Sequence, residues 1–173
     1  MQPRTHLAID RRLCGEPLDP AGTAAGTARV GLATVPEMAA DAAGLVHGGF
    51  VFGLADHAAM LAVNHPNVVL GSAAVRFSRP VAVGERLIAE ATVAETAGRR
   101  SRVTVEVRRV AAGGTASSGG AGETAGEIAG ETVMTGELIC FTLDRHVLER
   151  VGGERGDGLA AAPRPAARAR ERR

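Results

Sequence analysis

The sequence contains no tryptophan, tyrosine or lysine, so all 20 of its basic residues are arginine. Alanine and glycine are also abundant, which is the composition expected from a gene with strong G+C bias, and arginine richness alone is therefore no sign of nucleic-acid binding. The formal net charge is +1. A chain so close to neutrality has no overall field that would draw it to nucleic acid or to an anionic membrane, and neither is expected as a partner.

Cysteine is scarce as well, with Cys14 and Cys140 as the two examples. Two cysteines are too few for a disulfide scaffold, and neither they nor the histidines have the spacing of a zinc site. No metal or cofactor is expected. The first twelve residues lack the apolar core of a signal peptide, and no apolar run approaches the roughly 20 residues of a membrane span. We therefore expect a cytoplasmic protein with reduced thiols.

A length of 173 residues suits one domain with a substantial core. We assign that domain to residues 1–150. Within it, residues 111–130 include "AGETAGEIAGET" and have too little apolar surface to pack, so they are expected to form a solvated insertion. Residues 151–173, rich in alanine, arginine and proline, are expected to be a disordered tail.

The apolar pattern predicts one helix and a set of strands. Residues 1–26 are expected to be irregular because glycine and proline recur there, and a short strand is expected over 28–35. An apolar segment of helical length runs from 50 to 64 and ends before Pro66. Strands with period-two alternation follow over 68–80, 86–95, 101–110 and 132–144. This order predicts an α+β fold with a five-stranded antiparallel sheet wrapped around one long central helix.

Alternation assigns side chains to faces. Ala73, Val75 and Phe77 are predicted to share one face of their strand. In the strand over 101–110, the valines at 103, 105 and 107 are predicted to point inward, and residues 102, 104, 106 and 108 outward.

Asp56 is the unexpected residue, because it lies in the middle of the apolar helix. A buried carboxylate costs several kcal/mol unless a partner or a function compensates. Gly48 and Gly49 precede the helix, whose first N–H groups are unpaired and carry partial positive charge. Directed at a carbonyl oxygen, such groups form an oxyanion hole. Asp56 lies about two turns beyond Gly49, so the simplest site would combine these groups across two chains.

Each of these residues also has an ordinary structural explanation. Asp56 could be satisfied by backbone groups or by an arginine. His47 could cap the helix or bind a neighbouring loop, and His57 is expected to face solvent or an interface.

Taken together, the segments "GLVHGGFVFGLADHAAMLAVN" and "FSRPVAVGERLIAEATV" resemble the hotdog-fold acyl-CoA thioesterases, especially the phenylacetate-pathway type. The shared features are H-G-G, an apolar helix containing L-A-D, a strand ending in R-P, and V-G-E. The resemblance covers roughly residues 27–144 apart from the insertion.

The resemblance implies an enzyme that hydrolyses an acyl-CoA thioester to a free acid and coenzyme A. It implies a homodimer or homotetramer with active sites at the subunit interface. Asp56 corresponds to the catalytic base or nucleophile of the family, the Gly48 N–H to the donor that polarises the carbonyl, and His47 to a histidine that supports this loop.

We expect further substrate contacts from Asp41, Gly49, Phe52, Met60 and Arg76. Phe52 and Met60 lie one turn either side of Asp56, where an acyl chain would run, and Arg76, Arg79 or Arg86 could meet the nucleotide phosphates. Two positions depart from the pattern: Asp41 stands where many relatives carry asparagine, and His57 where many carry threonine or serine.

Two other functions fit the same fold. The first is a non-catalytic protein that senses acyl-CoA, although Asp56 and the absence of a helix-turn-helix pattern in residues 1–26 favour the enzyme. The second is a hotdog hydratase or dehydratase, for which no matching His with Asp or Glu arrangement stands out. A purely structural protein is a further alternative.

Overall fold

The computed structural model describes residues 2–18, 24–110 and 130–150. The predicted tail, and all but the last residue of the predicted insertion, lie outside the described residues. The elements are α1 (Arg11–Cys14), β1 (Glu16–Leu18), β2 (Thr27–Ala33), the 3-10 helix η1 (Pro36–Met38), α2 (Gly48–Val63), β3 (Val68–Phe77), β4 (Arg86–Ala97), β5 (Arg100–Val110), β6 (Glu131–Thr142) and α3 (Val147–Arg150).

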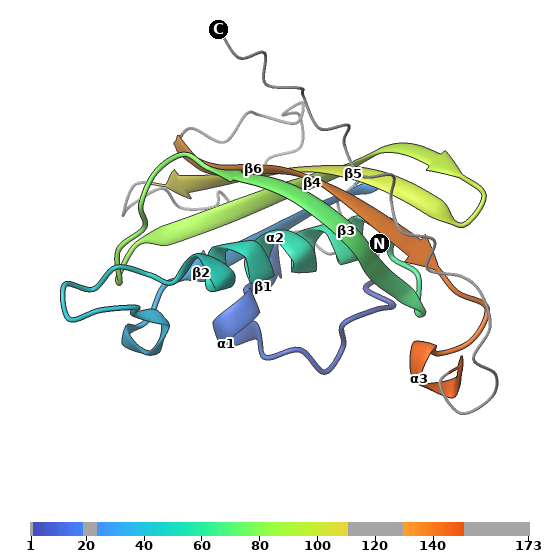
Figure 1. The fold of residues 1–173 in the computed structure, drawn as a ribbon, viewed down its shortest axis with the longest axis horizontal. Helices are drawn as coiled ribbons and strands as arrows, with labels where there is room; N and C mark the ends of the chain where they lie inside the picture. The colour runs from blue at the N-terminus through green and yellow to red at the C-terminus, as the bar shows by residue number, and fades with distance from the viewer. Residues whose placement is uncertain (1, 19–23, 111–129, 151–173) are drawn as a thin grey trace, which may run out of the picture.

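One antiparallel sheet, in the order β1-β2-β4-β5-β6-β3, curves over the long helix α2, which lies along its inner face (Figure 1). This is the predicted hotdog architecture. The sheet has six strands rather than the predicted five, because β1 pairs with β2. The expectation of irregular structure over residues 1–26 was wrong for α1 and β1, which are only four and three residues long. Elements so short leave no periodic signal, and Pro17 is tolerated because β1 is an edge strand.

The predicted alternation of β5 is confirmed. Val103, Val105 and Val107 are at most 3% exposed and face α2 with the inner residues of β4 and β6. The outer face of the sheet carries paired charges instead, such as Arg29 with Glu90 and Arg102 with Glu137. A single apolar layer between sheet and helix therefore forms the core.

Helix α2 begins at Gly48, two residues earlier than predicted, and Asn64 is its left-handed C-cap. The Asn64 side chain also accepts a hydrogen bond from the Arg4 backbone N–H and donates one to the Gln2 carbonyl. These contacts join the N-terminal segment to the far end of the helix. Alanines at 55, 58, 59 and 62 are at most 4% exposed. Their small side chains allow α2 to approach the sheet closely.

Strand β3 forms the edge of the sheet opposite β1 and pairs only with β6 among the described residues. Ala73 pairs with the fully buried Leu138 and Phe77 with the fully buried Met134, so the predicted face of Ala73, Val75 and Phe77 is the inner one. Val75 and Phe77 are nevertheless 38% and 51% exposed. The helix leaves this part of the inner face uncovered, and a strand edge open to pairing runs beside it.

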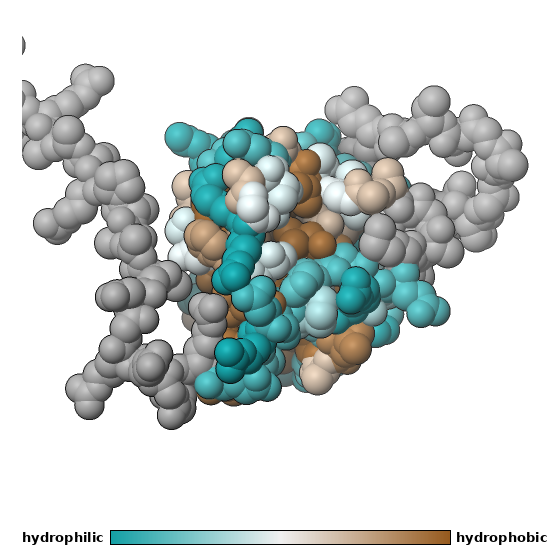
Figure 2. Space-filling model, turned by 90° about the vertical axis from the view of Figure 1, so that its right-hand side faces the viewer, coloured by the Kyte–Doolittle hydropathy of each residue, from teal (hydrophilic) through white to brown (hydrophobic). Residues whose placement is uncertain are grey.

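Seen from the end of the molecule at the right of Figure 1, apolar residues form separate patches among hydrophilic ones (Figure 2). Among the described residues, no helix has the length and apolar character to cross a membrane.

Candidate active site

His47 caps the N-terminus of α2. Its extended backbone precedes the helix, and its Nδ1 accepts a hydrogen bond of 3.0 Å from the Gly49 N–H. A Cβ at position 49 would lie 2.8 Å from that nitrogen, which is closer than side chains pack. The second glycine of H-G-G therefore makes room for the capping imidazole. His47 therefore caps the helix, which is the ordinary structural explanation for this residue.

Gly48 is the first residue of α2, and in the described part of the chain its N–H donates to no protein acceptor. A Cβ here would lie 3.4 Å from the Phe77 ring. The glycine opens onto a pocket of about 340 Å³ lined by Leu45, Val46, Gly48, Val51, Phe77, Ser78, Arg79, Pro80 and Val81. A free helical N–H beside an apolar pocket is suited to binding a carbonyl oxygen whose substituent enters that pocket.

Asp56 lies on the partly exposed stripe of α2, with Phe52 and Gly53. Its Oδ1 is buried without a hydrogen-bond partner among the described residues. Burial raises the pKa of Asp56 from 3.8 to about 6. Its charge adds to burial in raising the pKa of Cys140, a thiol of β6, to about 12. Asp56 is therefore a desolvated carboxylate near the strand that borders β3, and such a group is a stronger base than an exposed one.

Gly48 and Asp56 are not brought together within one chain. They are eight positions apart on the same helix, which is about 12 Å along its axis at 1.5 Å per residue. Asp56 is also absent from the residues that line the pocket at Gly48. One copy of the chain therefore contains an apolar pocket beside the Gly48 N–H and, separately, a desolvated carboxylate.

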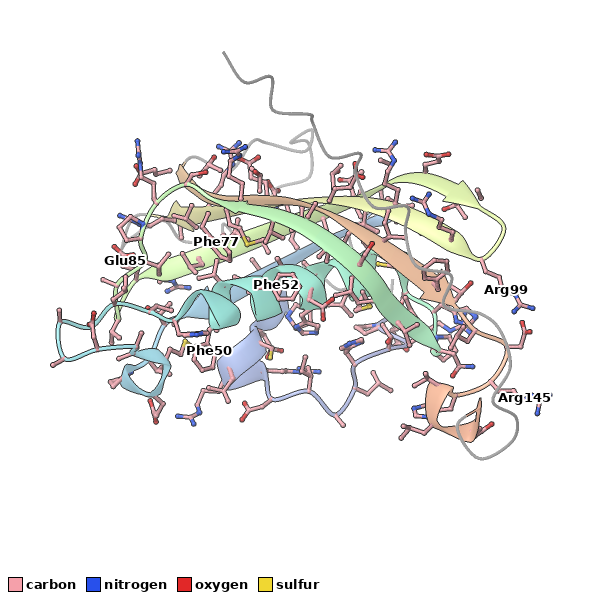
Figure 3. The ribbon with its side chains drawn as sticks, in the orientation of Figure 1. Phe50, Phe52, Phe77, Glu85, Arg99 and Arg145 are labelled. Carbon is pink, nitrogen blue, oxygen red and sulfur yellow. The ribbon has the colours of Figure 1, made fainter. Side chains whose placement is uncertain are left out.

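The other predicted substrate contacts have different surroundings. Phe52 is half-buried on the side of α2 away from Phe50 (Figure 3), whereas Met60 is 1% exposed and packs in the core. Arg76 alternates with Val75 and Phe77 and so lies on the outer face of the sheet, away from the pocket. Asp41 accepts hydrogen bonds from the backbone N–H groups of Ala43 and Leu45, which shapes the loop leading to the helix.

The expectation for His57 was wrong. It is 2% exposed, and its Nδ1 lies 3.1 Å from the Cys14 carbonyl, to which it donates. The His6 ring lies 6.0 Å from that of His57. Burial lowers the pKa of both imidazoles. The N-terminal segment, which carried no helix or strand signal, covers this side of α2.

Sequence reasoning missed Phe77, Ser78, Pro80 and Val81 as pocket walls. Of the three arginines considered for the nucleotide phosphates, Arg79 lines the pocket, whereas Arg76 and Arg86 do not. The only local signal was the R-P pair at the end of β3, since these residues meet Gly48 through tertiary contacts. Among the described residues, no group of three or more His, Cys, Asp or Glu side chains is placed to hold a metal ion.

The family model of the thioesterase superfamily matches residues 43–113. The chain is 42% identical to the uncharacterized protein PH1136 from Pyrococcus horikoshii, whose crystal structure superposes with a TM-score of 0.70 over 86% of this chain and 97% of that one. The chain belongs to the thioesterase superfamily. A mutant of the phenylacetic acid degradation protein PaaI from Thermus thermophilus is 26% identical, with a TM-score of 0.58 over 76% of this chain and 95% of that one.

Two curated relatives are longer than their matched segments. The methylthioribose-1-phosphate isomerase of Aquifex aeolicus is 52% identical over 106 residues, which are 61% of this chain and 23% of that protein. The transcription factor FapR of Shouchella clausii is 36% identical over 70 residues, which are 40% of this chain and 37% of that protein. The chain thus spans less than half the length of either relative.

Replacing Asp56 by asparagine is predicted to stabilise the protein at neutral pH. The folded state prefers the protonated carboxyl, so the cost of ionising Asp56 is absent below pH 3.8, grows as pH rises toward 6, and is fully present above it. The variant removes this cost. Its free energy of unfolding should exceed that of the wild type by about 1–3 kcal/mol at pH 8.

Urea unfolding at fixed protein concentration, at pH 8 and near pH 4, measures the difference. The gap between variant and wild type should shrink toward zero at the lower pH. A wild type more stable than the variant at pH 8 would show that Asp56 has a stabilising partner and is not a desolvated base.

Proposed function

We propose that this chain is an acyl-CoA thioesterase whose active site combines Asp56 of one protomer with the Gly48 N–H of another. The single observation that carries the proposal is the desolvated Asp56 carboxylate: its Oδ1 is buried without a hydrogen-bond partner among the described residues, and its pKa of about 6 leaves it ionised and basic at neutral pH. A folded domain has no structural use for such a group, because ionising it costs stability.

The reaction needs little more than these groups. A thioester carbonyl is activated enough for attack by water with a carboxylate base, or by the carboxylate itself. The Gly48 N–H would stabilise the negative charge that develops on the carbonyl oxygen. The acyl group would lie in the pocket of about 340 Å³ beside it. Products are a carboxylic acid and the thiol of coenzyme A, with the proton supplied by water.

The proposed dimer explains how the two halves meet. The open edge of β3 and the exposed apolar side chains of Val75 and Phe77 offer a surface that a second copy can cover. Phe77 also lines the pocket at Gly48. A two-fold axis beside β3 would bring each Asp56 toward the pocket of the partner subunit, and each dimer would then have two sites.

A non-catalytic sensor of acyl thioesters is the second candidate, and the match to FapR over 70 residues favours it. The two candidates differ in the use of Asp56. A sensor would bind acyl-CoA tightly without turnover and would have no requirement for an ionised carboxylate.

Thiol release from a panel of short-chain, medium-chain, long-chain and aryl acyl-CoA esters tests the enzyme directly. Wild type should hydrolyse at least one ester, and Asp56→Asn should lower kcat by about 10²-fold or more, since loss of a base typically costs 10²–10⁴-fold. The rate of the wild type should rise with pH through about 6 and then level off, because the ionised form of Asp56 is the active one.

Circular dichroism confirms that the variant is folded. Tight binding of acyl-CoA with no release of thiol from any ester would contradict the thioesterase proposal and favour the sensor. Equal rates for variant and wild type would exclude Asp56 from the chemistry.

Gly48→Pro is predicted to remove the carbonyl donor without breaking the helix. Proline is favoured at the first helical position, and the preceding His47 already has the extended backbone that proline requires. The variant should lower kcat by about 10²–10³-fold, the usual effect of losing one oxyanion donor.

Gly48→Ala is the matched control, because it adds a Cβ near Phe77 but keeps the N–H. Steady-state kinetics should therefore show a much smaller loss of kcat for alanine than for proline. Similar losses in the two variants would mean that crowding against Phe77, rather than the missing N–H, limits the rate.

A further inference from the structure

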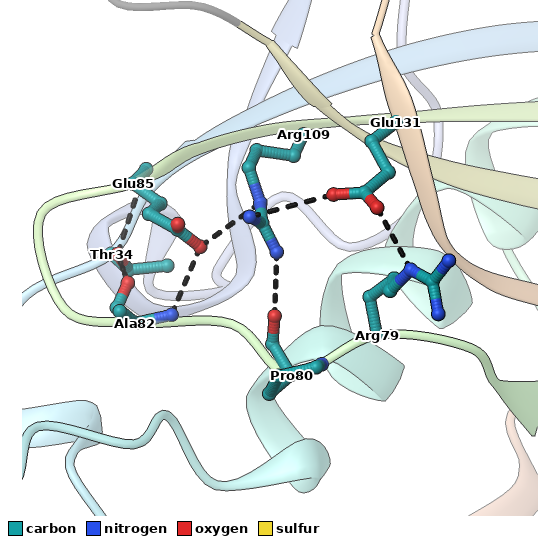
Figure 4. A network of polar contacts seen from close by, with 7 residues as sticks. All are labelled: Thr34, Arg79, Pro80, Ala82, Glu85, Arg109 and Glu131. Carbon is teal, nitrogen blue, oxygen red and sulfur yellow. Dashed lines mark hydrogen bonds and ion pairs between the residues drawn. The ribbon is translucent and has the colours of Figure 1, made fainter.

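Arg109, near the end of β5, lies at the centre of a network of polar contacts (Figure 4). Its Nη2 donates a hydrogen bond of 2.6 Å to the Pro80 carbonyl. Its guanidinium also forms ion pairs with Glu85 at 3.2 Å and with Glu131 at 3.5 Å. Glu131 in turn binds Arg79, with 2.8 Å between Oε1 and Nε. The Arg109 side chain is 30% exposed, so water screens these contacts only in part.

The partners of Arg109 all belong to, or bind, the loop between β3 and β4. Within this loop, the Glu85 carboxylate that faces Arg109 also accepts the Ala82 N–H at 2.9 Å. Thr34 of the loop after β2 donates its hydroxyl to the carbonyls of Ala82 and Glu85. Glu85 is thus held from two sides, and Arg109 provides the link to the sheet.

The same loop forms one wall of the proposed acyl pocket, through Ser78, Arg79, Pro80 and Val81. It also contacts the segment that precedes the helix, since the Val46 N–H donates to the Val81 carbonyl and the Val83 N–H to the Gly44 carbonyl. Arg109 itself does not line the pocket. Its guanidinium therefore holds this wall through the hydrogen bond to the Pro80 carbonyl, from the side that faces away from the pocket.

We propose that Arg109 is a positioning residue that fixes the Ser78–Val81 wall of the pocket and thereby sets how tightly the acyl thioester binds. The proposal rests on the proposed function of that pocket. Gly48 is held separately by its own helix and by the His47 cap, so loss of Arg109 widens the pocket without removing the carbonyl donor. Binding of substrate should suffer more than the chemical step.

The geometry explains why arginine is required. One planar guanidinium reaches a backbone carbonyl and two carboxylates from different nitrogen atoms. A lysine ammonium is a compact charge on a flexible stem and does not reproduce this fork. Arg109→Lys should therefore keep the charge balance with Glu85 and Glu131 but restore the wall only in part.

Arg102 supplies a matched control on the same strand. It pairs with Glu95 at 3.3 Å and Glu137 at 3.2 Å, and its side chain is 33% exposed, but neither partner lines the pocket. The experiment compares wild type with Arg109→Met, Arg109→Lys and Arg102→Met in the full chain. It measures kcat and KM on the best ester of the panel, and amide hydrogen exchange at Val46 and Val83.

Arg109→Met should raise KM about tenfold with kcat changed less than about threefold, because weaker positioning of substrate appears in KM when the reacting groups are intact. Arg109→Lys should fall between this variant and wild type, and Arg102→Met should match wild type. Exchange at Val46 and Val83 should accelerate in Arg109→Met, to a smaller extent in Arg109→Lys, and not in Arg102→Met.

A lower kcat with unchanged KM would overturn the proposal, since it indicates a smaller folded fraction rather than a displaced wall. So would equal effects from Arg102→Met. If the wild type hydrolyses no ester, the proposed function fails while exchange still reports on the wall. In that case, rates of amide hydrogen exchange at Val46 and Val83 that are unchanged in Arg109→Met would refute the positioning role as well.

Discussion

Burial of α2 inside the curve of the sheet is the constraint on which the rest of the structure depends. Nine of the sixteen residues of the helix are buried, and four of these are alanines that permit a close approach to the sheet. The small alanine side chains let the helix pack against the valines of β5 and the inner residues of β2, β4 and β6. Any polar group carried by this helix is consequently placed where water is scarce.

The burial of α2 determines the chemical properties of the polar groups that it carries. Asp56 is desolvated because its neighbours are apolar side chains and thiols rather than cations, and its proton affinity rises as a result. At the other end, Gly49 of the H-G-G sequence makes room for the His47 cap, and the Gly48 N–H has no acceptor among the described residues. The Asp56 carboxylate and the Gly48 N–H therefore both belong to α2, but their separation along the helix keeps them apart. In the proposed dimer, a second copy covers the exposed inner face of β3 and brings them together.

The fold could largely be predicted from the sequence, because its signals are local. The apolar run around Asp56 and the alternating valines of β5 each identify their element. β1 was missed because three residues that include Pro17 are too few to show an alternating pattern. They form a strand only through pairing with β2. At the site, Gly48 and Asp56 are recognisable from their own segment. Phe77 at the pocket and Arg109 behind it are not, since the contact of Arg109 with Pro80 joins residues 29 apart in sequence.

The most direct test of the account is whether one active site takes residues from two chains. Asp56→Asn and Gly48→Pro chains, each nearly inactive alone, would be unfolded together, refolded as a mixture and assayed for thiol release. Random pairing makes half of the dimers mixed, and each mixed dimer has one intact site of two, so the account predicts about a quarter of wild-type activity. Activity no greater than that of the separate variants, in a mixture shown to contain mixed dimers, would contradict it and place both groups within one chain.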